Sequence, residues 1–191
     1  MNAPAGPGRV IVAITGASGS ILGVRALELL RQAGVETHLV ISAGARLTLL
    51  RETGRKIEDV NGLASFFYDP GDLGAAIASG SFITRGMLIV PCSMKTLSAV
   101  ANSYADNLIV RAADVCLKEG RPLLLAVRET PLHRGHLRLM DLAARAGAII
   151  YPPIPFFYGA SQSLDEILTQ TVGRMLLRLG IDNPNYPRWI G

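Results

Sequence analysis

The sequence predicts an α/β fold: a single doubly wound, Rossmann-like (flavodoxin-like) parallel sheet with helices on both faces. Short apolar runs rich in β-branched residues alternate with amphipathic helical patterns, which favours parallel strands joined by right-handed crossovers. A glycine-rich turn follows the first of these runs, at the usual nucleotide-binding position of such sheets. The length of 191 residues, with 49% of them hydrophobic and 18% charged, suits one domain with a sizeable core.

The individual elements can be placed from their periodicity and their end signals. Strands are expected at Val10–Thr15, Glu36–Ser42, Gly86–Val90, Pro122–Val127 and Ala148–Tyr151. Helices are expected at Ser20–Ala33 before Gly34, at Asn107–Glu119 before Gly120, and from a capping box of Ser163 and Glu166 to Leu179 and Gly180. The segment Leu63–Ala78 is ambiguous. One domain should span residues 1–191, with a flexible tail at 1–8 and an irregular C-terminal arm at 183–191.

Composition and charge argue against several classes of protein. The net charge is +4, but Lys and Arg are scattered instead of forming basic runs, so nucleic-acid binding is not expected. The longest uncharged run, between Arg145 and Asp165, is broken by three prolines, so a membrane-spanning helix is not expected either. Cys92 and Cys116 follow or sit within apolar stretches, which indicates free thiols in a reducing, cytoplasmic compartment.

The turn Thr15–Gly19 (Thr-Gly-Ala-Ser-Gly) lies between a strand and an amphipathic helix. Its small residues let a phosphate approach the N–H groups at the helix N-terminus. The alternative is a tight turn that needs glycine only for its backbone conformation, but the position after the first strand favours a cofactor site. Gly16, Gly19 and Gly23 do not form G-x-G-x-x-G, and Ser42 stands where an acidic ribose ligand would be expected, so NAD and NADP are disfavoured.

Two further loops follow predicted strands and should meet the first turn in one crevice. Pro91–Thr96 offers hydroxyls and an amine, and Ser93 is also suited to cap the next helix, a role compatible with anion binding. Arg128 and Glu129 place a guanidinium beside a carboxylate. A surface ion pair is the alternative there, but Arg suits phosphate recognition and Glu can act as an acid or base.

Tyr158 follows a proline-rich turn beyond the last strand, and Arg174 lies inside the final helix among apolar neighbours. Taken alone, Tyr158 is more often a packing residue and Arg174 more often a surface residue. His38, His133 and His136 lack the spacing of a metal site, so ordinary packing or surface roles and no metal are expected.

Taken in order, these motifs resemble the flavin prenyltransferases, UbiX-type enzymes formerly described as aromatic-acid decarboxylases. The resemblance spans the chain from about Val10 to Trp189. It rests on Thr15–Gly19, Pro91–Ser98, Arg111–Asp114 followed by Leu117–Glu119, Arg128–Pro131, Phe157–Tyr158 and Arg188–Trp189. One departure is Leu22, where the family often carries an aromatic residue, and this would alter a pocket wall without touching the chemistry.

The resemblance implies FMN as the cofactor and dimethylallyl monophosphate as the prenyl donor. The FMN ligands that it implies are Gly16, Ala17, Ser18, Ser42, Ser93, Met94, Lys95, Thr96 and Arg128. The donor ligands that it implies are Lys118, Tyr158 and Arg174, with Arg111 and Trp189 nearby and open to supply by another subunit. Glu129 would move a proton, and Ser18 would hydrogen-bond near the reacting edge of the flavin.

The implied reaction joins the dimethylallyl group to N5 and C6 of reduced FMN, needs no metal, and makes a cofactor for a separate decarboxylase. Cations and hydrogen-bond donors such as Lys118, Arg128, Tyr158 and Arg174 would stabilise the departing phosphate. The family forms large homo-oligomers, so we expect a homo-oligomer here, up to a dodecamer.

Two other functions remain open at this point. A flavin-dependent cysteine decarboxylase of related fold would oxidise its substrate with unmodified FMN, but Pro91–Thr96 does not spell the P-x-M-N-type loop of those enzymes. A flavin-binding or storage protein without turnover would use its phosphate ligands only as an anchor. The discriminating feature is whether Glu129, Tyr158 and Arg174 converge on a second anion site, away from the FMN phosphate.

Overall fold

The computed structural model describes residues 8–157, 161, 163–182 and 186. In this part of the chain, six parallel strands form one sheet in the order β3-β2-β1-β4-β5-β6. The strands are β1 (Arg9–Ile14), β2 (Glu36–Ile41), β3 (Phe66–Tyr68), β4 (Met87–Cys92), β5 (Leu123–Val127) and β6 (Ile149–Ile150). The chain winds outward in both directions from the β1–β4 pair, which confirms the predicted doubly wound sheet.

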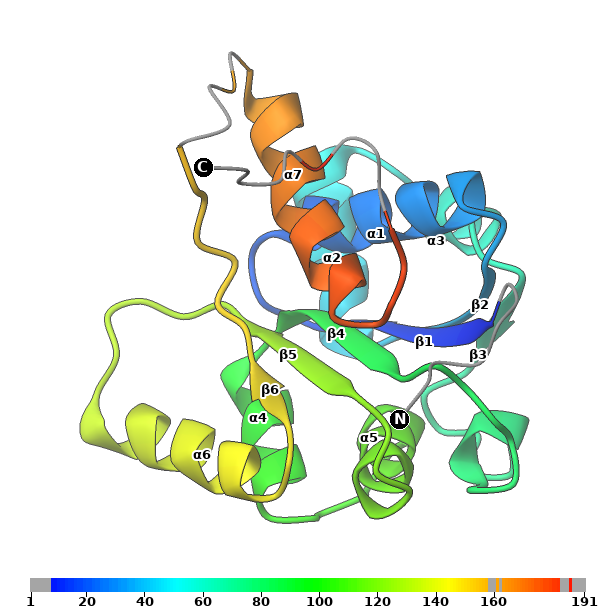
Figure 1. Ribbon diagram of the computed structural model, residues 1–191, viewed down its shortest axis with the longest axis vertical. Coiled ribbons are helices and arrows are strands. Elements are labelled where there is room, and N and C mark those ends of the chain that lie inside the picture. Colours follow the sequence, from blue (N-terminus) through cyan, green and yellow to red (C-terminus); the bar gives the residue numbers. More distant parts are fainter. Residues whose placement is uncertain (1–7, 158–160, 162, 183–185, 187–191) are drawn as a thin grey trace.

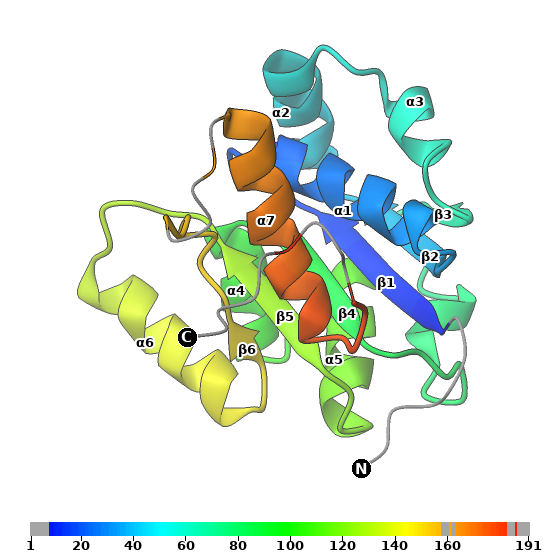
Figure 2. The same ribbon diagram turned by 45° about the horizontal axis from the view of Figure 1, so that its top comes forward.

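Helices cover both faces of the sheet (Figure 1, Figure 2). One face carries α1 (Ser20–Gln32), α2 (Ala43–Thr53), α3 (Ile57–Asn61) and α7 (Leu164–Leu177). The other face carries α4 (Met94–Ala101), α5 (Leu108–Lys118) and α6 (Arg134–Arg145), with a 3₁₀ turn at Ala76–Ala78 against α5. This two-faced arrangement confirms the predicted fold class.

Strand β1 explains why the sheet needs both layers. Val12 and Ile14 pack into the core on the α1 and α7 side, whereas Ile11 and Ala13 pack into the core on the α4 and α5 side. Successive side chains of a strand point to opposite faces, so a strand covered on both faces reads as a continuous apolar run. Burying each of the larger side chains contributes about 1.5–3 kcal/mol.

The predicted helix ends agree with the observed caps. Asn107 caps α5 by accepting the N–H of Val110, and Ser163 caps α7 by accepting the N–H of Glu166. Helix α7 ends at Leu177, two residues before the predicted Leu179. The ambiguous segment Leu63–Ala78 contains the short edge strand β3 and the 3₁₀ turn, and three residues are too few to show a period.

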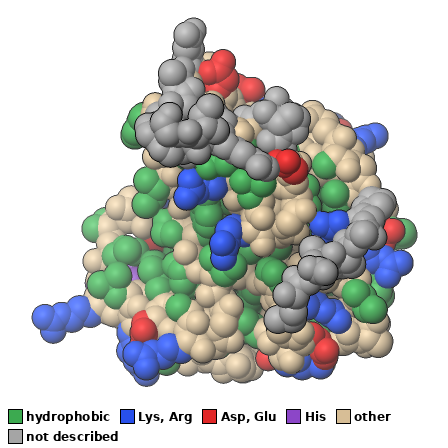
Figure 3. Space-filling model, viewed as in Figure 1, with side chains coloured by type: hydrophobic (Ala, Val, Ile, Leu, Met, Phe, Trp, Pro, Cys, Tyr) green, Lys and Arg blue, Asp and Glu red, His purple; other side chains and the backbone are tan. Residues whose placement is uncertain are grey.

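The molecular surface and the chain ends complete the description. Lys and Arg side chains are scattered over the face drawn in Figure 3, without a continuous basic area. No helix in the described ranges is long and apolar enough to cross a membrane. The predicted tail at 1–8 and arm at 183–191 fall almost wholly outside the described residues, and the single domain over 1–191 stays a prediction.

Leu22, the residue at which the sequence departs from the family pattern, is 6% exposed and packs in the core on the α1 and α7 side of the sheet.

Candidate functional site

A cleft of about 520 Å³ opens at the carboxyl ends of the strands, beside the point where β1 and β4 are neighbours. Its walls come from the segments that follow β1, β2, β3 and β4 and from the beginning of α5. The lining residues are Gly16, Ser42, Ala43, Gly44, Pro70, Gly71, Ser93, Lys95, Thr96, Asp106, Asn107 and Ile109. The cleft has the size of a small-molecule site and lies at the topological switch point, where doubly wound sheets bind their ligands.

Besides the beginning of α5, the N-termini of α2 and α4 open into this cleft. Ser42 Oγ accepts the N–H of Ala45 at 3.2 Å and so caps α2, while Ser93 Oγ accepts the N–H of Thr96 at 3.3 Å and so caps α4. Both serines line the cleft, so the positive ends of both helix dipoles are directed toward it. The exposed Lys95 in the first turn of α4 has no hydrogen bond or ion pair within the described chain. Together these groups form a favourable site for a phosphate.

The turn after β1 packs closely against the start of α2. A Cβ atom at Gly16 would lie 3.2 Å from the carbonyl carbon of Gly44 and 3.3 Å from its Cα. Any side chain at Gly16 would therefore push the start of α2 away from the turn after β1. Of the predicted FMN ligands, the structure brings Gly16, Ser42, Ser93, Lys95 and Thr96 to one cleft.

The N-terminus of α1 differs, because it is already hydrogen-bonded to an acidic side chain of the chain itself. Glu52 Oε2, from the last turn of α2, accepts the N–H of Gly19 at 2.9 Å and the N–H of Ser20 at 2.8 Å. The Gly19 and Ser20 amides are therefore already engaged, and the prediction that the turn binds a phosphate would have to be met by its other amides. The Glu52 carboxylate takes the place that the helix terminus offers to an anion.

Glu52 also holds the side chain of Ser18. Burial acts to raise the pKa of Glu52, but hydrogen bonds from the Ser18 hydroxyl and from the Ser20 and Gly19 amides outweigh it and keep that pKa below its usual range. Glu52 is therefore ionised near neutral pH and orients the Ser18 hydroxyl. A hydroxyl that donates its proton in this way still has lone pairs with which to accept another hydrogen bond.

Sequence reasoning missed Glu52, because no local motif surrounds it. The signal lies in helical spacing. The backbone of Gly44 packs against Gly16. Thr48 accepts a hydrogen bond from the Ser20 hydroxyl at 3.2 Å, and the Glu52 carboxylate accepts the N–H of Gly19. Residues four apart share one face of a helix, so one face of α2 follows the whole glycine-rich turn.

Arg128 and Glu129 lie where β5 leaves the sheet, at the same edge as the cleft. The N–H of Arg128 donates to the Cys92 carbonyl at 3.1 Å, and Glu129 Oε1 accepts the N–H of Thr130 at 3.0 Å. Both side chains are exposed. Met94 packs against the core on the α4 side, so its backbone is what it can offer to a ligand. The roles of Arg128, Glu129, Met94 and Ala17 stay predictions.

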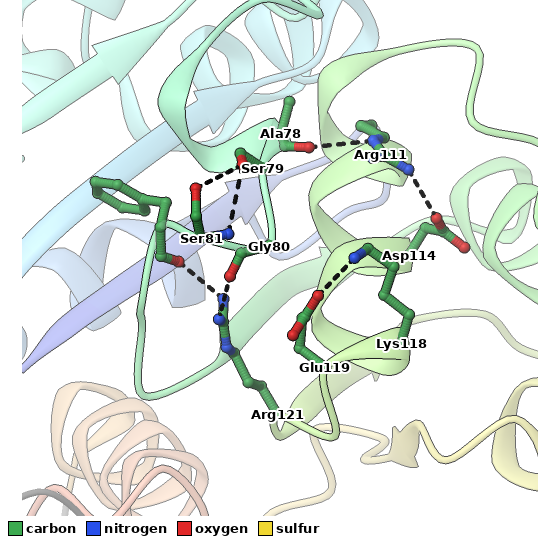
Figure 4. A network of polar contacts seen from close by, with 10 residues as sticks. Ala78, Ser79, Gly80, Ser81, Arg111, Asp114, Lys118, Glu119 and Arg121 are labelled. Atoms are coloured by element: carbon green, nitrogen blue, oxygen red, sulfur yellow. Dashed lines mark hydrogen bonds and ion pairs between the residues drawn. The ribbon is translucent and has the colours of Figure 1, made fainter.

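Arg111 and Lys118, two of the predicted donor ligands, lie on α5 with carboxylate partners (Figure 4). Arg111 donates to the Ala78 carbonyl at 3.2 Å and forms an ion pair with Asp114 at 3.0 Å. Lys118 forms an ion pair with Glu119 at 2.5 Å. Neither cation is among the residues that line the cleft.

Arg174 lies on α7, whose buried side chains pack on the opposite face of the sheet from α5. It is exposed and donates to the Tyr186 hydroxyl at 3.0 Å. The sheet therefore separates Arg174 from Arg111 and Lys118, and one chain does not bring these three cations together. Tyr158 and Trp189 lie outside the described residues.

Comparison with known proteins places the chain in a family. It matches the Flavoprotein family over residues 3–176. Flavin prenyltransferase UbiX of Escherichia coli (strain K12) is 55% identical over 186 residues, which cover 96% of this chain and 98% of that protein. This chain belongs to the flavin prenyltransferase family. The structure of AnUbiX (PadA1), solved in complex with FMN and dimethylallyl pyrophosphate, has a TM-score of 0.94 at 47% identity, covering 96% of this chain and 97% of that chain.

Other solved structures bear on the assembly and on a rival function. A dodecameric FMN-dependent UbiX-like decarboxylase from Escherichia coli O157:H7 has a TM-score of 0.92 at 47% identity, covering 96% of this chain and all of that chain (100%). The FMN-dependent cysteine decarboxylase TvaF has a TM-score of 0.65 at 14% identity, over 92% of this chain and 99% of that chain. That likeness is one of fold alone, whereas the flavin prenyltransferases match in fold and sequence.

Proposed function

We propose that this flavin prenyltransferase transfers a dimethylallyl group to N5 and C6 of reduced FMN and delivers the prenylated flavin to a separate decarboxylase. The observation that carries the proposal is the cleft at the β1–β4 switch point, where the N-termini of α2 and α4 converge beside Lys95. These groups are suited to the FMN phosphate. With the phosphate there, we assign Ser18, which is hydrogen-bonded to Glu52, to the reacting end of the flavin.

In the proposed reaction the allylic C–O bond would break as N5 bonds to that carbon and gives up its proton. C6 would then add to the remaining C=C bond, with one proton taken up by the alkene and one released from C6, which would close a fourth ring and leave the flavin with a net gain of C5H8. The chain must anchor the flavin phosphate, receive the N5 proton, and stabilise the departing phosphate. Water must also stay away from the allylic carbon, since it would compete as a nucleophile.

Ser18 and Glu52 are suited to the N5 proton. The Ser18 hydroxyl donates to an ionised carboxylate and can accept a hydrogen bond from N5–H, so a proton can pass through the hydroxyl to Glu52. Glu129 is assigned to a proton on the leaving phosphate, because it neighbours Arg128 at the same sheet edge. A carboxyl group can meet a phosphate favourably only while one of the two carries a proton.

The donor phosphate site is proposed to form between subunits. Arg174 and the α5 cations lie on opposite faces of the sheet, so contributions from neighbouring copies would bring such cations to one donor molecule. Ile154 and Phe157 are 73% and 81% exposed, which suits contact with another subunit. The UbiX-like decarboxylase from Escherichia coli O157:H7 is dodecameric, and we propose a homo-oligomer of that kind here.

We also propose that the protein works in the cytoplasm as one domain over residues 1–191. Cys92 and Cys116 are free and buried, and burial raises the pKa of each to about 12. Such thiols are protonated and unreactive at neutral pH, so they serve as packing residues. This use of cysteine fits a reducing compartment.

The test is anaerobic incubation of the protein with reduced FMN and either dimethylallyl monophosphate or dimethylallyl pyrophosphate, followed by mass analysis of the released flavin. A mass gain of C5H8 with at least one donor is expected, and the better donor identifies the phosphorylation state. Unmodified flavin with both donors, despite tight FMN binding, would instead indicate a flavin-binding protein. Oxidative decarboxylation of a peptide with a C-terminal cysteine would support the other rival.

A further inference from the structure

Thr15 opens the glycine-rich turn but cannot contact a ligand, because it is fully buried between the ends of β1 and β4. Its hydroxyl donates to the Pro91 carbonyl at 2.7 Å and accepts the N–H of Ser93 at 2.8 Å. The side chain thus joins the segment after β1 to the segment after β4 across the switch point.

This connection begins where the regular strand pairing ends. The β1–β4 ladder runs to the pair of Ala13 and Ile89, and the β4–β5 pairing shifts register between Ile89 and Cys92. Beyond the ladder, the Thr15 N–H still donates to the Pro91 carbonyl at 3.2 Å. The Ser93 N–H, in contrast, finds its acceptor in the Thr15 side chain. The placement of Ser93 therefore depends on that hydroxyl.

Ser93 in turn sets the position of neighbouring cleft groups. Its Oγ lies 3.1 Å from Thr96 Oγ1 and 3.3 Å from the Thr96 nitrogen, and both residues line the cleft. A change in the backbone at Ser93 would move the cap of α4 together with these hydroxyls. Because they are the groups suited to a phosphate, a shift of this kind should weaken anion binding.

We propose that Thr15 is a positioning residue, which holds the Ser93 loop in the geometry that binds the FMN phosphate. The inference rests on the proposed function, since FMN affinity is one of its readouts. Thr15→Val keeps the shape of the side chain and the backbone hydrogen bond but removes the hydroxyl, whereas Thr15→Ser keeps the hydroxyl.

A matched control exists at the other end of the sheet. Thr37 is 1% exposed, and its hydroxyl accepts the N–H of Ser65 at 3.0 Å, far from the cleft at the beginning of β2. Thr37→Val therefore removes a buried hydroxyl that also accepts one backbone N–H. A purely structural role of Thr15 predicts the same behaviour from the Thr15→Val and Thr37→Val variants.

Titration with FMN should give a Kd about tenfold or more above the parent for Thr15→Val, because the Ser93 loop would shift to satisfy its unpaired N–H and FMN binding would have to restore it. Thr15→Ser should bind within about twofold of the parent, and so should Thr37→Val, although Thr37→Val loses thermal stability. A parent-like Kd for Thr15→Val, or an equal loss for Thr37→Val, would overturn the proposal.

Hydrogen exchange of the FMN-free protein gives a second readout that needs neither FMN nor a variant. The Ser93 amide should exchange as slowly as the amides within β4, although Ser93 lies outside the strand ladder. Fast, loop-like exchange at Ser93 in the parent would also overturn the proposal. If the parent binds no FMN, the proposed function fails, and the exchange measurement still decides the role of Thr15.

Discussion

Helices α1, α2 and α4 begin near the carboxyl edge of the sheet, and their N-termini are used in two ways. The N-terminus of α1 is closed by Glu52, whose carboxylate accepts two of its backbone N–H groups. The N-termini of α2 and α4 are capped by serines and open into the cleft. An anion from outside would meet a negative charge at the first site and favourable dipoles at the other two. In the proposed function, flavin anchoring and proton transfer are therefore assigned to different helix N-termini.

This separation gives the glycine-rich turn a different role from the usual one. A turn of small residues after the first strand is usually interpreted as a phosphate site. Here the turn lies along α2 and carries Ser18, while we assign the phosphate donors to the N-termini of α2 and α4. Changes at the reacting end should therefore alter the rate, and changes at the anchoring end should alter FMN retention.

The largest expected effect comes from Glu129→Gln. The substitution keeps shape and hydrogen bonding but removes proton transfer, so the product-forming rate should fall by roughly 10²–10⁴, the usual contribution of a general acid or base. FMN affinity should change little. Anaerobic single-turnover mixing followed by flavin absorbance measures the rate, and a variant that reacts as fast as the parent would remove Glu129 from the mechanism.

Glu52→Gln tests the closed N-terminus directly. Loss of the negative charge removes both the proton acceptor and the group that orients Ser18, so the single-turnover rate should fall by about 10²-fold while FMN Kd stays near the parent value. Glu58→Gln, an exposed carboxylate on α3, is the matched control. Loss of FMN binding with an unchanged rate would show that the α1 terminus anchors the flavin after all.

Ser93→Ala tests the open N-termini. It removes the cap of α4 and a hydroxyl that lines the cleft, so FMN Kd should rise by about tenfold while the turnover of bound flavin changes little. Ser163→Ala removes the corresponding cap of α7, on the other side of the sheet. Equal effects of the two variants on FMN titration would contradict the assignment of the phosphate to α4.

The smallest effect concerns stability at the amino end of β2, away from both sites. His38 is 2% exposed and contacts Tyr68 and Glu36. Burial lowers the pKa of His38, although the neighbouring Glu36 opposes this. Below about pH 6.5 this imidazole is therefore protonated more readily in the unfolded chain than in the folded chain. The free energy of unfolding should decrease as the pH falls through this range.

Urea unfolding between pH 7.5 and 5.5 measures this effect, whose slope for one proton cannot exceed about 1.4 kcal/mol per pH unit. His38→Gln should flatten the slope. An unchanged slope in that variant would assign the pH dependence to other groups.

Much of this molecule can be predicted from its sequence, and the limits have physical causes. The buried strands and the caps Asn107 and Ser163 carry local signals, namely β-branched runs and side chains that bind nearby amides. The convergence of Ser42 and Ser93 follows from parallel topology alone. These features depend on short segments or on general rules of sheet assembly.

The remaining features depend on contacts between distant segments. Glu52 reaches the turn at Gly19 across 33 residues, and no periodicity encodes which carboxylate closes a helix N-terminus. The resemblance assigns Arg174 to the donor site with Arg111 nearby or from another subunit, and topology places their helices on opposite faces of the sheet. Local sequence patterns do not encode whether another subunit supplies such a residue.

Helix α2 fixes the distance between Ser42, which lines the cleft, and Glu52, which accepts the amides at the N-terminus of α1. The helix begins after the cap Ser42 and carries Glu52 in its last turn. Between these two residues, Gly44 and Thr48 contact the glycine-rich turn and the start of α1. Inserting or deleting one residue within this span would rotate Glu52 by about 100° and displace it by about 1.5 Å relative to Ser42. Substitutions on the outward side of this helix should be tolerated. A change in its length would instead alter the spacing between Ser42, assigned to flavin anchoring, and Glu52, assigned to proton removal.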